Sequence, residues 1–349
     1  MVSAQVISTV LQKAVEVATH SWEYGTVGEA LLEWDTPKLS IWNNPFPGGK
    51  VPTLDVTNTS ALKYIKSFII TTGPTLVDGD GAAGDPASLG IPALQIGKSD
   101  QKYWDAAIRQ YNHLVNDVPR WDNGAISHRE AYPELWADFV YMVPPFMAYY
   151  GVATSSVSVM KEAAQQCKHY HDALVQPSGA WLHIIGDHTK DYALWSTGNA
   201  WAAAGMSRVF ATLKKSPLAA QVASEQTMVR GYVKEILDAS IKFDNDSSGL
   251  LRNYLNDTMW WGEISGTSLL AATALRMAKL EPATFGKNYV DWAEKKMKVV
   301  DGKIDSSNGI VAPAINPLDW HDMNKYVSGS PEGQSFVVLL HAAWRDLKG

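Results

Sequence analysis

Two kinds of helical segment alternate along this chain, and this alternation limits its possible folds more than any other feature. Segments of the first kind carry apolar residues near i, i+3, i+4 and i+7, as in a helix with one buried face. They span residues 60–73, 102–118, 155–175 and 225–243. Segments of the second kind begin with Gly, Pro, Ser or acidic residues and are then apolar on nearly every face, which is typical of a buried helix. They span residues 84–97, 134–151, 196–213, 263–280 and 330–347.

The buried segments recur at intervals of roughly 50 to 70 residues, about one helical hairpin with its loops, which indicates a repeat architecture. The simplest arrangement is an all-α toroid of hairpins, with the buried helices inside and the amphipathic helices outside. An open two-layer solenoid is the structural alternative. No linker-like segment divides the chain, and the longest loop-like region is residues 42–60, so we expect one domain over residues 1–349.

The inner helices of such a ring are parallel, so their polar N-terminal turns meet at one end. Tryptophans gather at or beside these turns, and indole faces suit the apolar faces of sugar rings. They are Trp121, Trp136, Trp181, Trp195, Trp201, Trp260, Trp261 and Trp320. The alternative interpretation is that these large rings fill the middle of a wide helical ring.

Charge and composition exclude several classes of partner. The net charge of -6 and the lack of a dense Lys/Arg cluster argue against nucleic acid and anionic membrane surfaces. No apolar run reaches the roughly 18 residues of a membrane span. The single cysteine, Cys167, excludes a disulfide framework, and no Cys/His pattern has zinc-ligand spacing. We therefore expect a small or neutral ligand, with no cofactor and no metal; the sequence does not indicate the oligomeric state.

The N-terminal residues 1–22 read as an amphipathic helix without a signal-peptide core, so a cytoplasmic protein is expected. Three Asn-X-Ser/Thr tripeptides, at Asn58, Asn245 and Asn256, favour the alternative of a secreted protein whose signal peptide is absent from this sequence.

Asp138 is an acidic residue in an otherwise aromatic and aliphatic stretch, residues 133–151. Its position predicts the first turn of an inner helix, where the helix dipole favours an anion. Aromatic neighbours such as Trp136 and Phe139 oppose ionisation by desolvation, so its proton could be available near neutral pH. The alternatives are a helix cap and a paired structural carboxylate.

Asp85 lies in the Gly-rich acidic loop of residues 76–90, with Asp78 and Asp80. It precedes Pro86 directly, the arrangement of an N-cap followed by proline at the first helical position, so helix capping is its simplest interpretation. The loop lacks the ligand order of a calcium-binding EF-hand. Further along, residues 179–201 bring polar and aromatic candidates into one loop and helix start. These are His183, Asp187, His188, Trp195, Asn199 and Trp201.

Three segments resemble the unsaturated uronyl hydrolases, glycoside hydrolase families 88 and 105. Residues 124–148, "GAISHREAYPELWADFVYMVPPFMA", match the family's W-x-D-x-x-x-M-x-x-P-F pattern. Residues 179–187, "GAWLHIIGD", are similar to its G-L-x-x-H stretch, and residues 265–280 to a late inner helix. The resemblance implies an (α/α)6 toroid of six hairpins and an enzyme that acts on lyase-generated oligosaccharides.

The resemblance also implies roles for individual residues. Asp138 would be the general acid/base, Asp85 a second carboxylate beside the substrate double bond, and His183 a contact of the uronic ring. Protonation of the C4=C5 double bond at C4 and attack of water at C5 would give a hemiketal that opens and releases the next sugar. The full set of expected substrate contacts is His183, His188, Arg129, Trp136, Trp195, Asn199, Trp201 and Trp261.

One position departs from the family pattern. The family's W-x-R-x-x-x-W stretch has Thr197 in place of arginine here, so another residue, His188 or Arg129, would have to bind the uronate carboxylate. Two other functions stay open. A polysaccharide lyase on the same toroid would need a Tyr/His or Arg/His base arrangement on a long cleft, and a non-catalytic relative would bind sugar without turnover.

Overall fold

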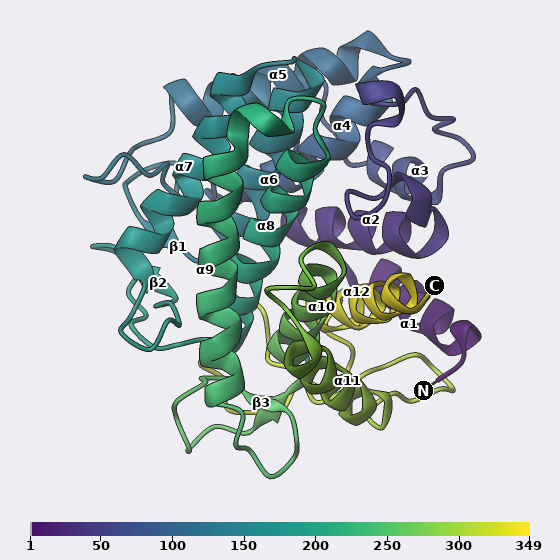
Figure 1. The fold of residues 1–349 in the computed structure, drawn as a ribbon, viewed down its shortest axis with the longest axis vertical. Coiled ribbons are helices and arrows are strands. Elements are labelled where there is room, and N and C mark those ends of the chain that lie inside the picture. The colour runs from purple at the N-terminus through teal and green to yellow at the C-terminus, as the bar shows by residue number, and fades with distance from the viewer. Residues whose placement is uncertain (1) are drawn as a thin grey trace.

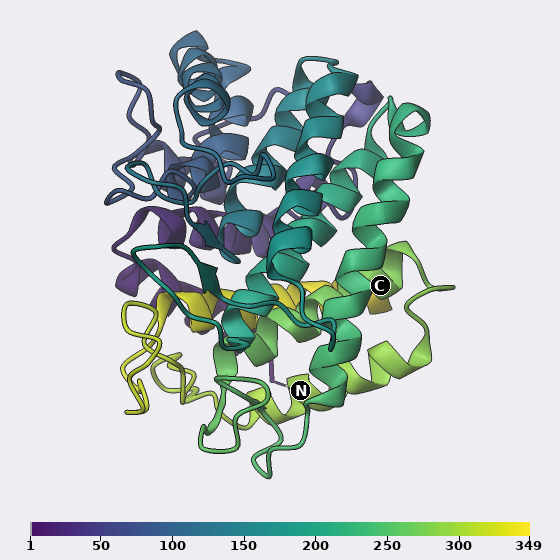
Figure 2. The same cartoon turned by 90° about the vertical axis from the view of Figure 1, so that its left-hand side faces the viewer.

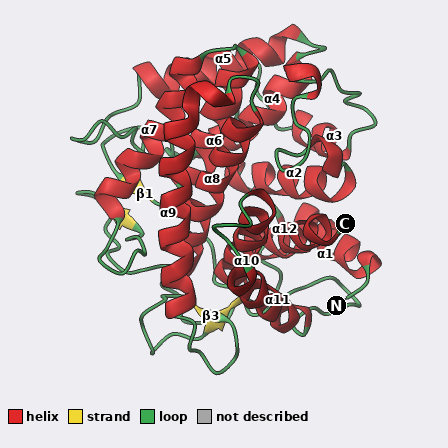
Figure 3. Ribbon diagram, in the orientation of Figure 1, coloured by secondary structure: helices red, strands yellow, loops and turns green. Residues whose placement is uncertain are grey.

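The computed structural model describes residues 2–349, and most of them lie in helices (Figure 3). The α-helices are α1 Ala4–Val17, α2 Ser21–Asp35, α3 Ser60–Lys66, α4 Gly90–Gly97, α5 Gln101–Asn116, α6 Phe139–Ala153, α7 Val157–Leu174, α8 Ser196–Lys215, α9 Ala223–Lys242, α10 Ile264–Leu280, α11 Lys287–Asp301 and α12 Pro331–Lys348. The short 3-10 helices are η1 Pro37–Leu39, η2 Pro47–Gly49, η3 Asp85–Leu89 and η4 Ala219–Val222. The strands are β1 Leu135–Trp136, β2 Ile184–Ile185, β3 Leu251–Arg252 and β4 Gly262–Glu263.

Buried and half-exposed helices alternate along the chain, as the sequence predicts. In α8 every residue from Ser196 to Leu213 is buried, and in α10 every residue from Ile264 to Ala278 is buried. The outer helix α5, in contrast, buries one face only. Helices that are apolar all round must be enclosed by protein, so they form the inner layer, while α5, α7, α9 and α11 cover them (Figure 1).

The inner helices close into a ring. Going round it, α2 contacts η3, η3 contacts α6, α6 contacts α8, α8 contacts α10, α10 contacts α12, and α12 returns to α2. The predicted toroid of six hairpins is therefore confirmed, and the open solenoid is excluded because its ends would not meet. Some inner helices approach very closely: a Cβ atom on Gly205 of α8 would lie 2.1 Å from the carbonyl oxygen of Val140 in α6.

Short strands tie together the loops that precede the inner helices. β1, just before α6, pairs antiparallel with β2, in the loop that leads to α8, through Leu135 with Ile185 and Trp136 with Ile184. β3 pairs with β4, which leads directly into α10. Figure 2 turns the side with β1 and β2 toward the viewer. These pairings fix the backbone at the end of the ring where the inner helices begin.

Two expectations about local structure were wrong. The predicted N-terminal helix ends at Val17, and a second helix, α2, begins at Ser21. The longest loop is residues 302–330, between α11 and α12, rather than residues 42–60. This long segment is held by isolated bridges such as Ala314 with Tyr326, which leave no periodic signal in the sequence. Among residues 2–349, no helix is long and apolar enough to cross a membrane.

Candidate active site

A pocket of about 230 Å³ opens at the end of the ring where the inner helices begin. Side chains reach it from the cap or first turn of α2, η3, α6, α8 and α12, five successive positions of the inner layer. They are His20, Asp85, Asp138, Trp195 and Glu332. The prediction that polar N-terminal turns from distant parts of the chain meet at one end is confirmed.

Helix dipoles explain why this end of the ring tolerates buried acidic side chains. Asp138 immediately precedes α6, and Glu332 lies in the first turn of α12. Glu263, which is fully buried at the start of α10, accepts hydrogen bonds from the backbone N–H groups of Ser265 at 2.5 Å and Gly266 at 2.6 Å. The partial positive charge at helix N-termini stabilises anions at these positions, which reduces the cost of burying them.

Asp138 occupies the N-cap position of α6 but does not cap it, because its side chain accepts no backbone hydrogen bond there. The side chain faces the pocket and remains 17% exposed. Its Oδ2 atom lies 3.3 Å from Nε2 of the fully buried His183, outside hydrogen-bond geometry. The carboxyl group of Asp138 therefore contacts His183, is not used to cap the helix, and remains accessible to a ligand.

His183 connects Asp138 to a buried carboxylate. Its Nδ1 atom is 2.9 Å from Oδ2 of Asp191, which also accepts a hydrogen bond from the Tyr254 hydroxyl at 2.7 Å. Burial lowers the pKa of His183, but the charge of Asp138, together with the hydrogen bond to Asp191 and its charge, outweighs burial and raises the pKa. Burial raises the pKa of Asp191, yet the hydrogen bonds from His183 and Tyr254 leave it lowered. His183 thus sits between two acids, below the pocket wall.

Asp85 is the first residue of η3, and its side chain makes no capping hydrogen bond, so the capping interpretation was wrong. It is 7% exposed and lines the pocket, with Oδ1 at 3.9 Å from Nε2 of His128. Burial and then the charge of Asp138 raise the pKa of Asp85 to about 8, against the opposing charge of Arg129. Asp85 therefore keeps its proton at neutral pH, when nearby carboxylates can be ionised.

Aromatic rings and one cation form the wall next to these acids. His128 stacks on Trp136 at 4.8 Å between ring centroids, and burial lowers the pKa of His128 to about 3. Arg129 lies over the Trp136 ring at 6.0 Å from its centroid and donates to the carbonyl oxygen of Asp80 at 3.2 Å. Trp320, from the loop before α12, meets Trp136 edge-to-face at 5.6 Å. These flat faces can pack against a sugar ring.

A tight backbone turn lets the loop that carries Asp80 pair with the loop that carries Arg129. Gly81 has φ of +77°, in the left-handed region that glycine adopts without strain, and an added Cβ there would lie 2.8 Å from the guanidinium of Arg129. The adjacent Ala82 forms a bridge with Arg129. Arg129 is therefore held beside Asp85 by the backbone.

The structure brings some predicted residues to the pocket and leaves others away from it. Asp85, Asp138, Arg129, Trp136 and Trp195 line it. The remaining predicted contacts, which do not line it, are His183, His188, Asn199, Trp201 and Trp261.

Each of these has a structural partner. The Asn199 amide holds the backbone of Trp181 through bonds of 2.8 and 3.0 Å, and Trp201 packs against Tyr141 inside the ring. His188 is exposed and stacks on Tyr132, while Trp261 donates to the carbonyl oxygen of Met323.

Sequence reasoning missed several residues that line the pocket: His20, Trp22, His128, Met142 and Glu332. Trp320, which also lines it, was among the tryptophans expected at this end of the ring. A signal for Glu332 existed. Like Asp138, it is an acidic residue at the start of a segment that is apolar all round, the very pattern that singled out Asp138. Trp22 has no such signal, because its segment reads as an ordinary amphipathic helix.

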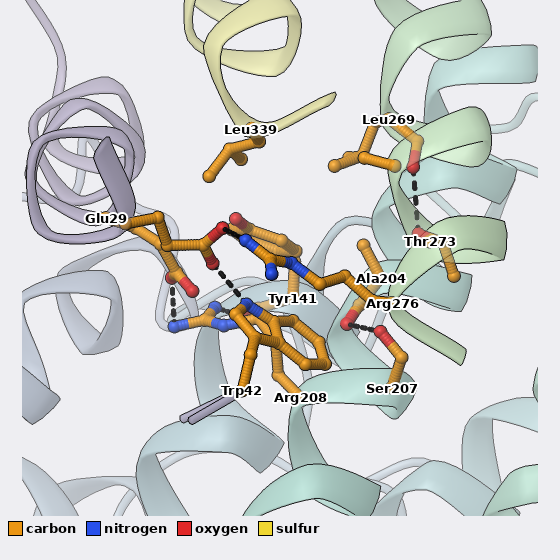
Figure 4. Close-up of a pocket in the computed structure, with 12 residues that line it drawn as sticks. Glu29, Trp42, Tyr141, Ala204, Ser207, Arg208, Leu269, Thr273, Arg276 and Leu339 are labelled. Atoms are coloured by element: carbon orange, nitrogen blue, oxygen red, sulfur yellow. Dashed lines mark hydrogen bonds and ion pairs between the residues drawn. The ribbon is translucent and has the colours of Figure 1, made fainter. Parts of the chain in front are cut away.

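A second, much smaller cavity, of about 20 Å³, lies deeper in the ring beside the middle turns of the inner helices (Figure 4). Buried ion pairs border it: Glu29 with Arg208, and Glu33 with Arg276 at 2.6 Å. Burial raises the pKa of Glu29 to about 7, although Arg208 opposes this. Removing one partner of such a pair typically costs about 3 to 5 kcal/mol. These pairs join α2 to α8 and to α10, and we assign them a structural role.

Comparisons with known proteins give one family match. Residues 61–340 match the model of Glycosyl Hydrolase Family 88. No curated protein matches the sequence. Within residues 2–349, no group of three or more His, Cys, Asp or Glu side chains is arranged to hold a metal ion.

Solved structures show the same fold at low sequence identity. A possible member of the GH105 family from Salmonella enterica serovar Paratyphi A has 16% identity and a TM-score of 0.75, over 100% of this chain and 95% of that one. The unsaturated glucuronyl hydrolase of Bacillus sp. GL1, responsible for the degradation of glycosaminoglycan, has 14% identity and a TM-score of 0.65, over 98% and 96%. A polysaccharide lyase has 14% identity and a TM-score of 0.65, over 99% and 97%.

Proposed function

Because this chain belongs to Glycosyl Hydrolase Family 88, we propose that it removes a 4,5-unsaturated uronic acid from the non-reducing end of lyase-generated oligosaccharides. The reaction would be hydration of the C4=C5 double bond rather than direct displacement at the anomeric carbon. The observation that carries the proposal is the pair of carboxyl groups, Asp138 and Asp85, in a pocket walled by aromatic rings.

The two acids differ in a way that suits this chemistry. Asp85 holds its proton at neutral pH, and the charge of Asp138 contributes to that. The pair therefore enters the reaction with a proton available beside the double bond. We propose that the proton held by the pair moves from Asp85 to Asp138, which caps no helix with its side chain, and that Asp138 then delivers it to C4. As a carboxylate again, Asp138 accepts a proton from the water that attacks C5. The hemiketal at C5 opens and releases the next sugar.

His183 and Arg129 are proposed to support this chemistry in different ways. His183 touches Asp138 from below the pocket wall, so we propose that it positions Asp138 rather than contacting the sugar. Among the described residues 2–349, Arg129 is the only Lys or Arg whose side chain lines the pocket. We propose that its charge attracts the uronate at the pocket mouth, a role that Thr197 cannot fill because it is buried and faces Glu263.

Asp138→Asn tests the proposal. The replacement is nearly isosteric and breaks no capping bond, so the fold should be kept while turnover falls by about 10,000-fold or more, because one group serves both proton transfers. Turnover is followed as loss of the ultraviolet absorbance of the unsaturated uronate, across a panel of lyase-generated oligosaccharides. Substrate binding and melting temperature are measured on the same samples. Asp105→Asn, at an exposed position of the outer helix α5, is the matched control.

Other outcomes would assign other functions. Cleavage in the middle of a polymer, with new absorbance appearing, would identify a lyase. Binding of the oligosaccharides without turnover by the wild-type protein would identify a sugar-binding relative. An Asp138→Asn variant that keeps most of its activity, or that unfolds, would remove Asp138 from the proposed mechanism.

A further inference from the structure

Glu332 places a buried carboxyl group in the pocket with one oxygen unused. It lies in the first turn of α12 and is 3% exposed. Its Oε1 atom accepts a hydrogen bond from Nε1 of Trp22 at 2.9 Å, which fixes the orientation of the group. Its Oε2 atom is buried and has no hydrogen-bond partner. An unsatisfied buried polar atom costs about 1 to 3 kcal/mol, so its presence in a pocket wall points to a ligand.

The order of the inner helices places Glu332 across the pocket from Asp138. Round the ring run α2, η3, α6, α8, α10 and α12, and α12 closes on α2. In a ring of six, the position of α12 is opposite that of α6. A sugar ring held in this pocket therefore lies between the side chain that begins α6 and the one in the first turn of α12.

The surroundings of Glu332 keep it in its neutral form. Burial raises its pKa well above the usual range, the hydrogen bond from Trp22 opposes this, and the charges of Asp138, Glu23 and Glu263 raise it further. These three acids lie at the N-terminal ends of α6, α2 and α10, so negative charge from three helices favours the protonated form of Glu332. The free oxygen of a carboxylic acid can then act as a donor.

Other charged and titratable groups line the same pocket. They are His20 at the cap of α2, Asp80 and Asp85 near η3, and Arg129 in the loop before α6. The guanidinium of Arg129 already donates to the backbone carbonyl oxygen of Asp80, and its charge acts on the Asp85 carboxyl group. An anionic sugar thus meets one cation and several acids, and it needs a donor on the side of the pocket away from Arg129.

We propose that Glu332 binds the carboxylate of the uronic acid, with the carboxylic acid proton as the hydrogen-bond donor and Oε2 as the atom that faces the ligand. The proposal deepens the proposed function and rests on it for the identity of the ligand. A bond between O–H and a carboxylate is short and roughly twice as strong as one between neutral groups. Ionised Glu332 would instead repel the same carboxylate, so affinity depends on this proton.

Two inert probes test this binding apart from turnover. Methyl β-glucuronide carries the carboxylate, and methyl β-glucoside is the same sugar with a neutral group in its place; neither has a double bond to hydrate. Binding is measured by calorimetry from about pH 5 to about pH 9 on the full chain. The wild-type protein should prefer the glucuronide at low pH and lose this preference as the pH rises. Affinity for the glucoside should not follow that change.

Three variants separate the donor from its alternatives. Glu332→Gln keeps an N–H donor without a titrating proton, so the pH dependence of glucuronide binding should be smaller than in the wild type, and what remains comes from ionisation of Asp85 in the same pocket. Glu332→Leu has no donor and should lose about 10- to 100-fold in glucuronide affinity, with glucoside affinity unchanged; both variants are also compared by melting temperature, because Leu removes the acceptor of the Trp22 bond. Glu16→Gln, at an exposed position of α1, is the matched control and should behave as wild type.

The proposal is overturned if Glu332→Leu binds the glucuronide as tightly as wild type, if it weakens both probes equally, or if the pH dependence in Glu332→Gln is as large as in the wild type. Hydration of unsaturated oligosaccharides is assayed separately. Selective glucuronide binding without hydration would exclude the proposed reaction but support the role of Glu332. Hydration without selective glucuronide binding would support the proposed reaction but exclude the role of Glu332.

Discussion

Replacing Asp85 with Asn should change how the stability of the protein depends on pH. Asp85 has an ordinary pKa of 3.8, and burial together with the charge of Asp138 raises it to about 8 in the folded protein. Between these values the folded protein keeps a proton that the unfolded chain has released. The stability that this proton provides is fully present below about pH 3.8 and is lost as the pH rises through about 8.

The size of the effect follows from the shift. Each pH unit between the two pKa values changes the free energy of unfolding by about 1.4 kcal/mol, so three units, from pH 5 to pH 8, give about 4 kcal/mol. Asn cannot titrate, and any cost of burying its amide does not depend on pH. The free energy of unfolding of Asp85→Asn, relative to wild type, should therefore rise by about 4 kcal/mol over this range.

Urea denaturation at pH 5, 6, 7 and 8 measures this difference, because other titrating groups contribute to both proteins and largely cancel. Asp105→Asn should show no such trend, since Asp105 is exposed on the outer helix α5. A difference between wild type and Asp85→Asn that stays within about 1 kcal/mol over the whole range would refute the neutral, buried Asp85. Steep loss of turnover in the same variant would support its role beside the substrate, and unchanged turnover would end it.

Two further predictions concern the wall of the pocket and the packing of the ring. Asp191→Asn removes the carboxylate bonded to His183, so the pKa of His183, followed by NMR titration, should fall; an unchanged value would show that Asp191 does not contribute to raising it. Gly205→Ala puts a Cβ atom 2.1 Å from the Val140 carbonyl oxygen and should cost about 1 to 3 kcal/mol in urea denaturation. Gly231→Ala, with open space around it in α9, should instead stabilise the protein by up to about 1 kcal/mol, and equal effects of the two variants would contradict this account of the packing.

The ring itself could be predicted because the distribution of apolar residues around a helix indicates how deeply that helix is buried. A segment such as residues 263–280, apolar on every side, can form a stable helix only where protein surrounds it, and the structure buries α10 accordingly. The same reasoning placed Asp138 at the start of an inner helix. The loop of residues 302–330 could not be predicted in this way, because it has no regular repeat of apolar residues. It reaches the pocket through Trp320.

The pairing of side chains was the least predictable part of the site. Asp85 has the sequence signature of an N-cap, but its carboxyl group turns to the pocket, where the charge of Asp138 acts on it. His183 was predicted as a sugar contact; in the structure it bonds to Asp191 and does not line the pocket. Contacts of this kind depend on how separate parts of the loops are placed next to each other. No local sequence pattern predicts that placement. The substrate contacts predicted from the sequence stay predictions.

Closure of α12 on α2 has a consequence for the order in which the protein can be made. The bond between Trp22 and Glu332 joins residues 310 positions apart, so one wall of the pocket uses both the second helix and the last. During synthesis the chain emerges from its N-terminus, and domains generally fold as units. The residues that α12 covers on α2 have no partner until the last helix has been translated. The ring and this wall of its pocket can therefore be completed only when the C-terminal helix is available.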